Sequence, residues 1–177
     1  QKCCIENNPF TIDPSKDWSD DEWYFDQEKR QFFSNDGYWI INEWSAKWRL
    51  IWGHLPCLQS LQGTQYWPKL DEDTIMFIEQ DEEFAPQVFD RHLQSLIQME
   101  DFSYVKWIVI GRFQHKTKMT PSLLRVILGS KKELKDIPIL ANANFWHTMP
   151  FITFPIGWIV EISTKEAQSK MIKIITH

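Results

Sequence analysis

An alternation of short apolar runs with amphipathic helical patterns is the feature that most constrains the fold of this chain. DTIMFIE (73–79) is rich in strand-forming residues and predicts a buried strand, and YVKWIVIG (104–111) predicts another. Between them, APQVFDRHLQSLIQM (85–99) predicts an amphipathic helix, because its apolar residues recur at helical spacing. The residues expected on its buried face are Phe89, Leu93, Leu96 and Ile97.

The segment TPSLLRVILG (120–129) predicts a second helix from its start and stop signals. Thr120 can cap the amino end, Pro121 suits the first helical position, and Gly129 marks the carboxyl end. Further strands are predicted for IPILAN (137–142), FITFPIG (151–157), WIVEIS (158–163) and MIKIIT (171–176). Strands that first alternate with helices and then follow one another indicate a mixed α/β fold class.

The first 36 residues differ from the rest of the chain. They are polar and acidic, as in DWSDDEW and DQEKRQ, and they show little periodicity. We expect residues 1–36 to form an extended segment or a long loop that serves as a linker from a domain upstream. Residues 37–177 are expected to form the folded domain, because a chain of 177 residues can bury one substantial core.

The charge and hydropathy of the chain argue against several classes of partner. The formal net charge is −5 and Lys and Arg form no block, so we expect neither nucleic acid nor an anionic membrane surface as a partner. No apolar run approaches the roughly 18 residues of a membrane-spanning helix. The opening QKCCIENNPF lacks the apolar core of a signal peptide, which predicts a cytoplasmic protein.

The cysteines and histidines show the pattern of neither a disulfide framework nor a metal site. Cys3 and Cys4 are adjacent and Cys57 is the third cysteine, and this odd count favours reduced thiols. The five histidines lack zinc-ligand spacing relative to cysteine or carboxylate residues. We therefore expect no metal and no other cofactor.

Two residues, Glu79 and His147, could carry chemistry. Glu79 ends the predicted strand 73–79, where α/β proteins place ligands and catalytic groups, and His147 lies in a turn before PFITFPIG. Taken singly, a solvated strand end and a structural histidine are the better interpretations. Taken together, the two residues permit a histidine base oriented by a carboxylate, which are two members of a nucleophilic triad. No serine or cysteine of this chain lies in a glycine-rich nucleophile elbow.

Four stretches of the chain occur in the order and at the approximate spacing of a known family. They are WRLIWGHLPCLQSLQGTQYWP, DTIMFIEQDEE, VKWIVIGRF and IPILANANFWHTMPFITFPIG. Over about residues 15–175, the chain resembles the C-terminal domain of serine peptidase family S66, which contains murein LD-carboxypeptidases and microcin C immunity proteins. The resemblance implies a swivelling β/β/α-type domain with a mixed sheet and flanking helices.

The resemblance also implies a mechanism. Family members combine an N-terminal domain that supplies a serine with a C-terminal domain that supplies Glu and His, and the matching positions here are Glu79 and His147. His147 would take the serine proton and Glu79 would orient the imidazole, for metal-free amide hydrolysis by a serine carboxypeptidase. We expect the 177-residue chain to be inactive without the serine domain, and we expect a homodimer because the family is commonly dimeric.

The substrate that the resemblance implies depends on the branch of the family. Murein-type members remove a terminal D-amino acid from a cell-wall peptide, and immunity-type members cleave an aminoacyl nucleotide from its toxic carrier group. NDGYW resembles the immunity branch, in which an aromatic residue stacks on the base, so Tyr38 and Trp39 are candidates, with a core role as the alternative. Glu83 stands where an immunity-type member has Lys. A non-catalytic binding module that keeps the fold is the alternative function.

Tryptophan is unusually frequent, with ten residues against only six glycines. The tryptophans that stand where the family pattern favours glycine are Trp44, Trp48, Trp52, Trp107, Trp146 and Trp158. Glycine is favoured where φ is positive or backbones approach closely, so tryptophan there would be strained. We hypothesise that these codons are UGA and are read as glycine in the source organism, which would restore the usual glycine share of about 7%. UGG codons at most of these positions would contradict the hypothesis and leave a tryptophan-rich core as the alternative.

Overall fold

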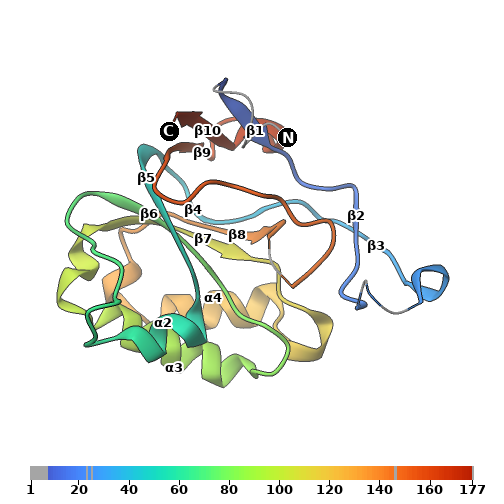
Figure 1. Ribbon diagram of the computed structural model, residues 1–177, viewed down its shortest axis with the longest axis horizontal. Coiled ribbons are helices and arrows are strands. Elements are labelled where there is room, and N and C mark those ends of the chain that lie inside the picture. The colour runs from blue at the N-terminus through green and yellow to red at the C-terminus, as the bar shows by residue number, and fades with distance from the viewer. Residues whose placement is uncertain (1–7, 23, 25, 146, 177) are drawn as a thin grey trace.

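The computed structural model describes residues 8–22, 24, 26–145 and 147–176, which form a mixed sheet with helices on one face (Figure 1). The main sheet has the strand order β1-β10-β9-β5-β6-β7-β8-β4, and a second sheet pairs β2 with β3. The strands are β1 (Phe10–Ile12), β2 (Asp17–Trp18), β3 (Phe33–Ser34), β4 (Trp39–Asn42), β5 (Ser45–His54), β6 (Thr74–Glu79), β7 (Val105–Gly111), β8 (Ile139–Ala143), β9 (Ile159–Ser163) and β10 (Ile172–Thr176). The α-helices are α2 (Leu55–Leu61), α3 (Pro86–Ile97) and α4 (Pro121–Gly129).

The centre of the sheet is parallel. β5, β6, β7 and β8 are parallel neighbours, and each passes to the next through α2, α3 or α4. Successive crossovers of one hand in one direction place their helices on the same face, and Figure 1 shows these helices together beneath the sheet. The carboxyl ends of the four strands therefore meet at one edge, which is where α/β proteins bind ligands.

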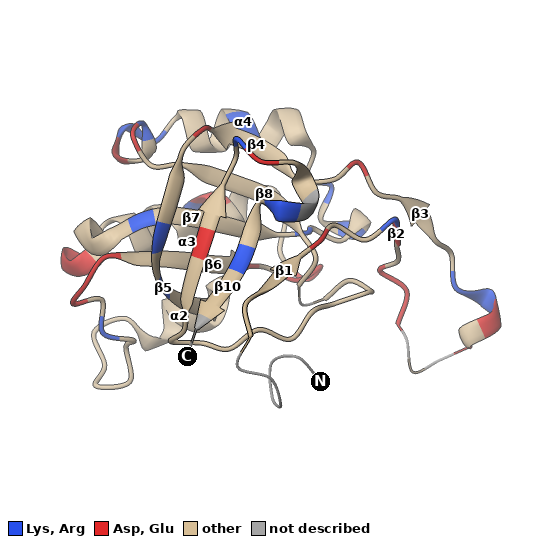
Figure 2. Cartoon of the chain, turned by 90° about the horizontal axis from the view of Figure 1, so that it is seen from above, with Lys and Arg blue, Asp and Glu red and all other residues tan. Residues whose placement is uncertain are grey.

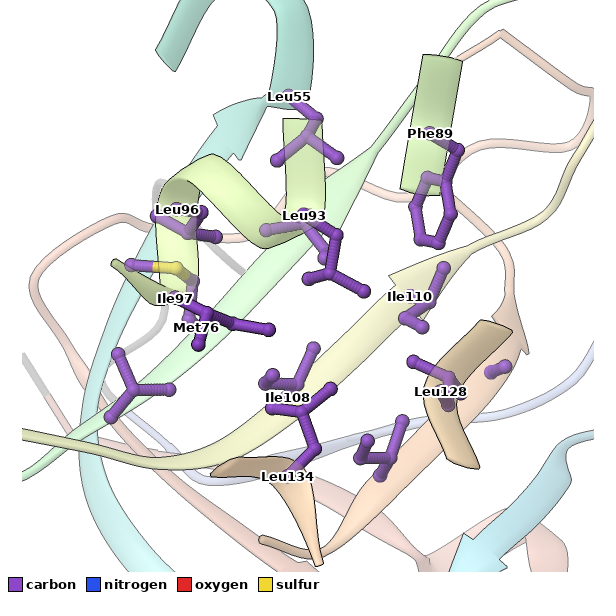
Figure 3. Packing of buried hydrophobic residues seen from close by; sticks show 14 of the residues in the cluster. Leu55, Met76, Phe89, Leu93, Leu96, Ile97, Ile108, Ile110, Leu128 and Leu134 are labelled. Atoms are coloured by element: carbon purple, nitrogen blue, oxygen red, sulfur yellow. The ribbon is translucent and has the colours of Figure 1, made fainter. Parts of the chain in front are cut away.

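The helix-covered face is packed mainly with aliphatic side chains. Figure 3 shows Leu55 of α2 and Leu93 of α3 pointing toward Met76 and Ile108 of the sheet, and these residues belong to one buried cluster. Burial of a side chain of this size contributes about 1.5–3 kcal/mol, so this layer fixes the helices against the strands. The four residues predicted on the buried face of α3 are all buried, as expected: Phe89, Leu93, Leu96 and Ile97.

The opposite face is covered by the sheet itself. β9, β10 and β1 continue antiparallel from β5, and their buried residues share one cluster with those of the central strands. This cluster is rich in aromatic residues: Phe77 stacks on Phe145 with ring centroids 5.4 Å apart and contacts Phe154 at 5.2 Å. The sheet is therefore curled, so that its outer strands close a second core.

The solvent side of the curled strands carries charges of alternating sign (Figure 2). Lys47 of β5 and Lys173 of β10 both lie opposite Glu161 of β9, and all three side chains are exposed. Opposite charges at facing positions stabilise a strand pair by roughly 0.2–1 kcal/mol. The same strand register therefore pairs opposite charges on the solvent face and brings apolar residues together on the inner face.

Most of the predicted elements are confirmed, with bounds that agree within two residues at each end. The confirmed predictions are the strands at 73–79, 104–111, 137–142, 158–163 and 171–176 and the helices at 85–99 and 120–129. Thr120 caps α4 as predicted, because its hydroxyl oxygen accepts a hydrogen bond from the Leu123 N–H at 3.2 Å. None of the helices in the described part of the chain is long and apolar enough to cross a membrane.

The prediction of a strand at 151–157 is wrong. The structure has no strand in this segment. Pro150 and Pro155 cannot donate a hydrogen bond to a neighbouring strand, which disfavours a ladder here. The segment contributes Ile152 and Phe154 to the aromatic core instead, so its apolar character reflects packing without strand pairing.

β5 and α2 have no counterpart among the predicted elements. The burial of β5 alternates irregularly, and charged residues such as Lys47 and Arg49 interrupt its apolar pattern. No turn separates the two elements, because Leu55 begins α2 directly after His54 ends β5. The usual turn signal at a strand end is therefore missing from the sequence.

The N-terminal segment is partly built into the fold, which differs from the expectation of a linker over residues 1–36. β1 pairs with β10 in the main sheet, and β2 and β3 pair with each other in an arm that projects from the body (Figure 1). Ser19 and Met149 exchange two backbone hydrogen bonds of 2.8 and 2.7 Å. Pairing of backbone groups decides this arrangement, and the polar composition of the segment does not reveal it.

The described tryptophans do not occupy the backbone conformation that the glycine hypothesis expects. Among the described residues other than glycine, only Lys118 and Asn142 have positive φ. Positive φ therefore gives no reason for glycine at the described tryptophan positions, and close approach of neighbouring backbones is the only reason that remains for the hypothesis. Trp107 is fully buried and its indole N–H has no hydrogen-bond partner among the described residues, whereas Trp44 is 64% exposed. Trp146 lies outside the described residues.

Candidate active site

The ends of adjacent parallel strands bring three functional positions together. His54 ends β5, Glu79 ends β6 in register with it, and Gly111 ends β7. A Cβ on Gly111 would lie 2.9 Å from the Glu79 Cβ and 2.8 Å from the Phe145 ring. Glycine at this position therefore lets Glu79 and Phe145 approach the backbone of β7.

The Glu79 carboxylate forms a direct hydrogen bond with His147. The Glu79 Oε2 lies 2.8 Å from the His147 Nδ1, so a proton on Nδ1 is donated to the carboxylate. The Glu79 side chain is only 2% exposed and the His147 side chain is 32% exposed. The structure therefore places a buried carboxylate behind a partly exposed imidazole.

Burial raises the pKa of Glu79. The hydrogen bond from His147 and the charges of His147 and His54 act in the opposite direction, and the neighbouring Asp81 raises the pKa further. A carboxylate in such surroundings gains most from a cationic neighbour, because water screens the pair poorly. Glu79 is therefore placed to stabilise an imidazolium on His147.

The turn that carries His147 is held from both sides. The paired backbone groups of Ser19 and Met149 fix the chain two residues after His147. The N–H of Ile152 also donates to the carbonyl oxygen of Asn144 at 3.1 Å. These long-range contacts position a histidine that no regular element carries.

A buried arginine ties the N-terminal segment to the same edge. Arg112 directly follows β7, and its guanidinium donates to the Asn142 Oδ1 at 2.9 Å and the Asn144 Oδ1 at 2.6 Å. It also lies over the Trp18 ring at 5.0 Å, and burial lowers its pKa to about 10. Asn144 in turn donates to the carbonyl oxygen of Asp13 at 3.2 Å. This network supports the segment that pairs with the His147 turn.

A second histidine lies beside the first, and the sequence reasoning did not select it. The rings of His54 and His147 are 5.6 Å apart between centroids. The His54 Nε2 lies 3.4 Å from the Asp81 Oδ2, and its Nδ1 lies 3.2 Å from the Cys57 Sγ. Only the parallel register of β5 and β6 could have revealed this residue, and β5 itself was not predicted.

A cavity of about 500 Å³ opens in front of His147. Its lining carries carboxylates from two regions: Asp20, Asp21, Glu22, Asp81, Glu82 and Glu83. Lys116 pairs with Glu82 at 2.7 Å, which compensates part of this charge, and the His115 Nδ1 lies 3.0 Å from the Asp20 Oδ2. The cavity therefore favours a positively charged group over an anion.

The remaining predicted site residues fall into two sets. Glu83 lines the cavity with His147, and its N–H donates to the Asp81 Oδ1 at 3.0 Å. Tyr38 is only 3% exposed and its hydroxyl donates to the carbonyl oxygen of Ile12 at 2.7 Å, while Trp39 packs against the helix-side core. Neither aromatic residue lines the cavity, because they lie at the β4 edge of the sheet. This placement does not support the stacking role expected for them.

The described residues include no group of three or more His, Cys, Asp or Glu side chains arranged to hold a metal ion. Cys57 is a free thiol, and Cys3 and Cys4 lie outside the described residues.

Comparisons with known proteins identify relatives of this chain in sequence and in structure. A family model described as the LD-carboxypeptidase C-terminal domain matches residues 49–162. "Putative carboxypeptidase YocD" of Bacillus subtilis (strain 168) is 46% identical over 169 residues, which cover 96% of this chain and 52% of the relative. The crystal structure of an MccF-like protein from Bacillus anthracis str. Ames matches with a TM-score of 0.92 at 43% identity, over 99% of this chain and 54% of that chain.

A more distant structure shares the fold. It is the structure of MccF in complex with glutamyl sulfamoyl guanosine, which matches with a TM-score of 0.77 at 23% identity, over 97% of this chain and 51% of that chain. The chain spans about half the length of the relatives it matches. The range that the family model matches contains both Glu79 and His147. The chain belongs to the family of LD-carboxypeptidase C-terminal domains, peptidase family S66.

Proposed function

We propose that this chain is the half of a serine carboxypeptidase that supplies the histidine base and its orienting carboxylate. The observation that carries the proposal is the 2.8 Å hydrogen bond between the buried Glu79 carboxylate and the His147 Nδ1. With Nδ1 occupied by Glu79, His147 would use its Nε2 for proton transfer. The serine that completes the triad would come from a part of the enzyme outside residues 1–177, as the family resemblance implies.

The proposed reaction is hydrolysis of an amide bond in two stages, each with two proton-transfer steps. In the first stage His147 takes the proton of the serine hydroxyl as the oxygen attacks the amide carbonyl, and it gives this proton to the departing amine, which leaves an acyl-serine. In the second stage His147 takes a proton from water as the water attacks the acyl-serine, and it returns this proton to the serine oxygen as the carboxylic acid departs. Glu79 holds the imidazole in the required tautomer and stabilises the imidazolium between the two steps. Burial makes Glu79 suited to this role, because its charge interacts with His147 through little water.

The acidic cavity supports a peptide substrate that carries an amine near the cleaved bond. Carboxylates attract an ammonium group and repel a phosphate, so a murein-type peptide suits this lining better than an anionic aminoacyl nucleotide. Glu83 is the proposed substrate contact, because it lines the cavity beside His147. An aminoacyl-nucleotide amide is the second candidate substrate, since MccF was solved with glutamyl sulfamoyl guanosine.

A fused protein tests the proposal. The half of the Bacillus subtilis relative that this chain does not match would be joined to residues 1–177. The product would be assayed on a murein tetrapeptide and on an aminoacyl-nucleotide amide. We expect peptide hydrolysis in the fused protein, and we expect His147→Ala to lower kcat/KM by at least about 10³-fold. Asp136→Asn, a change at an exposed position, is the matched control and should retain full activity.

Two outcomes of this experiment would count against the proposal. Retained turnover in the folded His147→Ala protein would remove His147 from the mechanism. A folded fusion that binds the peptide without cleaving it would favour the binding module. Homodimer formation and a cytoplasmic location stay predictions, and light scattering of the fused protein would test the first of these.

A further inference from the structure

Cys57, His54 and Asp81 form a second group of reactive side chains beside the proposed active site. The Cys57 Sγ lies 3.2 Å from the His54 Nδ1, and the His54 Nε2 lies 3.4 Å from the Asp81 Oδ2. Cys57 is exposed and free, whereas the His54 and Asp81 side chains are only 14% and 18% exposed. The thiol is therefore in hydrogen-bond contact with the imidazole, and the Asp81 carboxylate lies on the far side of the ring without a hydrogen bond to it.

The fold brings this group together from two adjacent strands. His54 ends β5 and Cys57 lies three residues later in the first turn of α2, so the two side chains lie on the same side of the chain. Asp81 follows β6, the parallel neighbour of β5, and His54 is in register with Glu79 just before it. The contact between His54 and Asp81 is thus set by strand pairing.

The charged and titratable groups that face His54 come from several elements. Asp81 and Glu79 at the end of β6 bring two carboxyl groups close to the His54 ring. His147 is the neighbouring ring at 5.6 Å. Burial lowers the pKa of His92 on α3, and the charge of Arg91 acts in the same direction. The 3.2 Å contact places the His54 Nδ1 where it can accept the proton of the Cys57 thiol.

We propose that Cys57 is an activated thiol that forms mixed disulfides with small, positively charged disulfide molecules. His54 takes the Cys57 proton, and the thiolate attacks one sulfur of the small disulfide. The Cys57–sulfur bond forms as the original disulfide bond breaks, and the departing thiolate receives the proton from His54. One disulfide is consumed and one is formed, so the exchange needs no further oxidant.

The preference for a cationic disulfide follows from the surroundings of the thiol. Asp81 contacts the base, and Glu82 and Glu83 follow it in the same acidic loop. Negative charge attracts a cationic reagent and repels an anionic one. The reaction uses only residues of this chain, so its test is independent of the proposed hydrolysis.

The rate of alkylation by iodoacetamide tests the activation of the thiol. A Cys3→Ser/Cys4→Ser protein retains Cys57 as its single cysteine. A free thiol is only a few per cent ionised at pH 7, so activation leaves room for a rate increase of about tenfold. We expect the native protein to react about tenfold faster than the same protein in urea, and we expect cystamine to add to Cys57 faster than glutathione disulfide. Mass spectrometry measures both reactions.

Matched variants assign the activation to the two partners. His54→Gln should lower the native alkylation rate to that of the unfolded chain, Asp81→Asn should lower it severalfold, and Asp136→Asn should leave it unchanged. A folded His54→Gln protein that reacts as fast as its parent would overturn the proposal. If His54→Gln does not fold, the comparison of native and unfolded protein still decides, because a native rate equal to or below that in urea would also overturn it.

Discussion

Two pairs of histidine and carboxylate lie side by side at the carboxyl edge of the sheet, and they differ in burial. Glu79 is 2% exposed and lies 2.8 Å from His147, whereas Asp81 is 18% exposed and lies 3.4 Å from His54. The two rings are only 5.6 Å apart, and the two carboxylates are separated by a single residue in the sequence. The same chemical types therefore occupy two different environments within one site.

The difference shows that two nearby carboxylates at the end of one strand can differ strongly in burial and in screening by water. Glu79 is the last residue of a fully buried strand, so its charge is shielded from water and depends on His147. Asp81 begins the loop that lines the cavity, where water and other charged groups screen its interaction with His54. We therefore expect the buried pair to dominate activity and the loop pair to act through Cys57.

The largest effect is expected for the exchange of Glu79 in the fused protein. Glu79→Gln should lower kcat by about 10⁴-fold, because an amide cannot hold the imidazole tautomer or stabilise the imidazolium. Asp81→Asn should change kcat by less than about tenfold, because its charge is partly screened. Steady-state kinetics on the murein tetrapeptide measures both values. Equal losses of kcat in the Glu79→Gln and Asp81→Asn proteins would contradict the expectation that the buried pair dominates activity.

A smaller effect on stability is expected for Gly111→Ala. The new Cβ would lie within 3 Å of Glu79 and Phe145, so the free energy of unfolding should fall by about 1–3 kcal/mol. Gly129→Ala is the matched control, because no atom lies within 4 Å of its Cβ position and its φ is not positive, and it should be neutral or slightly stabilising. Urea denaturation of residues 1–177 measures both. A Gly111→Ala protein as stable as the control would show that β7 does not constrain Glu79.

The pH dependence of stability should reveal the burial of Glu79. Its raised pKa means that the folded protein holds this proton more tightly than the unfolded chain does. The contribution of Glu79 to stability is therefore fully present below its ordinary pKa of 4.5 and is lost as the pH rises through the raised value. Relative to Glu79→Gln, the parent should thus lose stability as the pH rises above 4.5. Urea titrations of both proteins at several pH values measure this change. A parent protein that gains stability relative to Glu79→Gln as the pH rises would contradict the prediction.

The smallest effect is expected for the stability of Asp81→Asn. The Asp81 carboxylate lies 3.4 Å from the His54 Nε2 and forms no hydrogen bond with it, so the free energy of unfolding should change by less than about 1 kcal/mol. Thermal unfolding of residues 1–177 measures this change. A loss as large as that of Gly111→Ala would show that Asp81 is more constrained than its exposure indicates.

Periodicity in the sequence was sufficient to predict the elements with regular burial. The β6 strand and the α3 helix each bury a continuous face, so their patterns are unambiguous and their predicted bounds agree with the structure. The β5 strand escaped prediction because its burial is irregular and it runs directly into α2. The strand prediction at 151–157 failed because an apolar loop that packs against the core has the same composition as a buried strand.

The candidate site was only partly predictable for the same reason. Glu79 was marked by its place at the end of a strand, and His147 was selected through the family resemblance of its neighbours. The family resemblance suggested Tyr38 and Trp39 as base-stacking residues, whereas the structure places both of them away from the cavity at the β4 edge, which favours the alternative of a core role. The position of His54 beside His147 depends on the pairing of β5 with β6, and β5 was not predicted from the sequence.

The sequence by itself determined the mixed α/β class, most of the strands and helices, and the two residues of the proposed triad. These follow from local periodicity, capping and motif order, which depend on residues close together in the chain. The tertiary structure decided the curl of the sheet, the incorporation of β1, the 2.8 Å contact between Glu79 and His147, and the grouping of Cys57, His54 and Asp81. These features depend on strand register and burial, which join residues that are distant in the sequence.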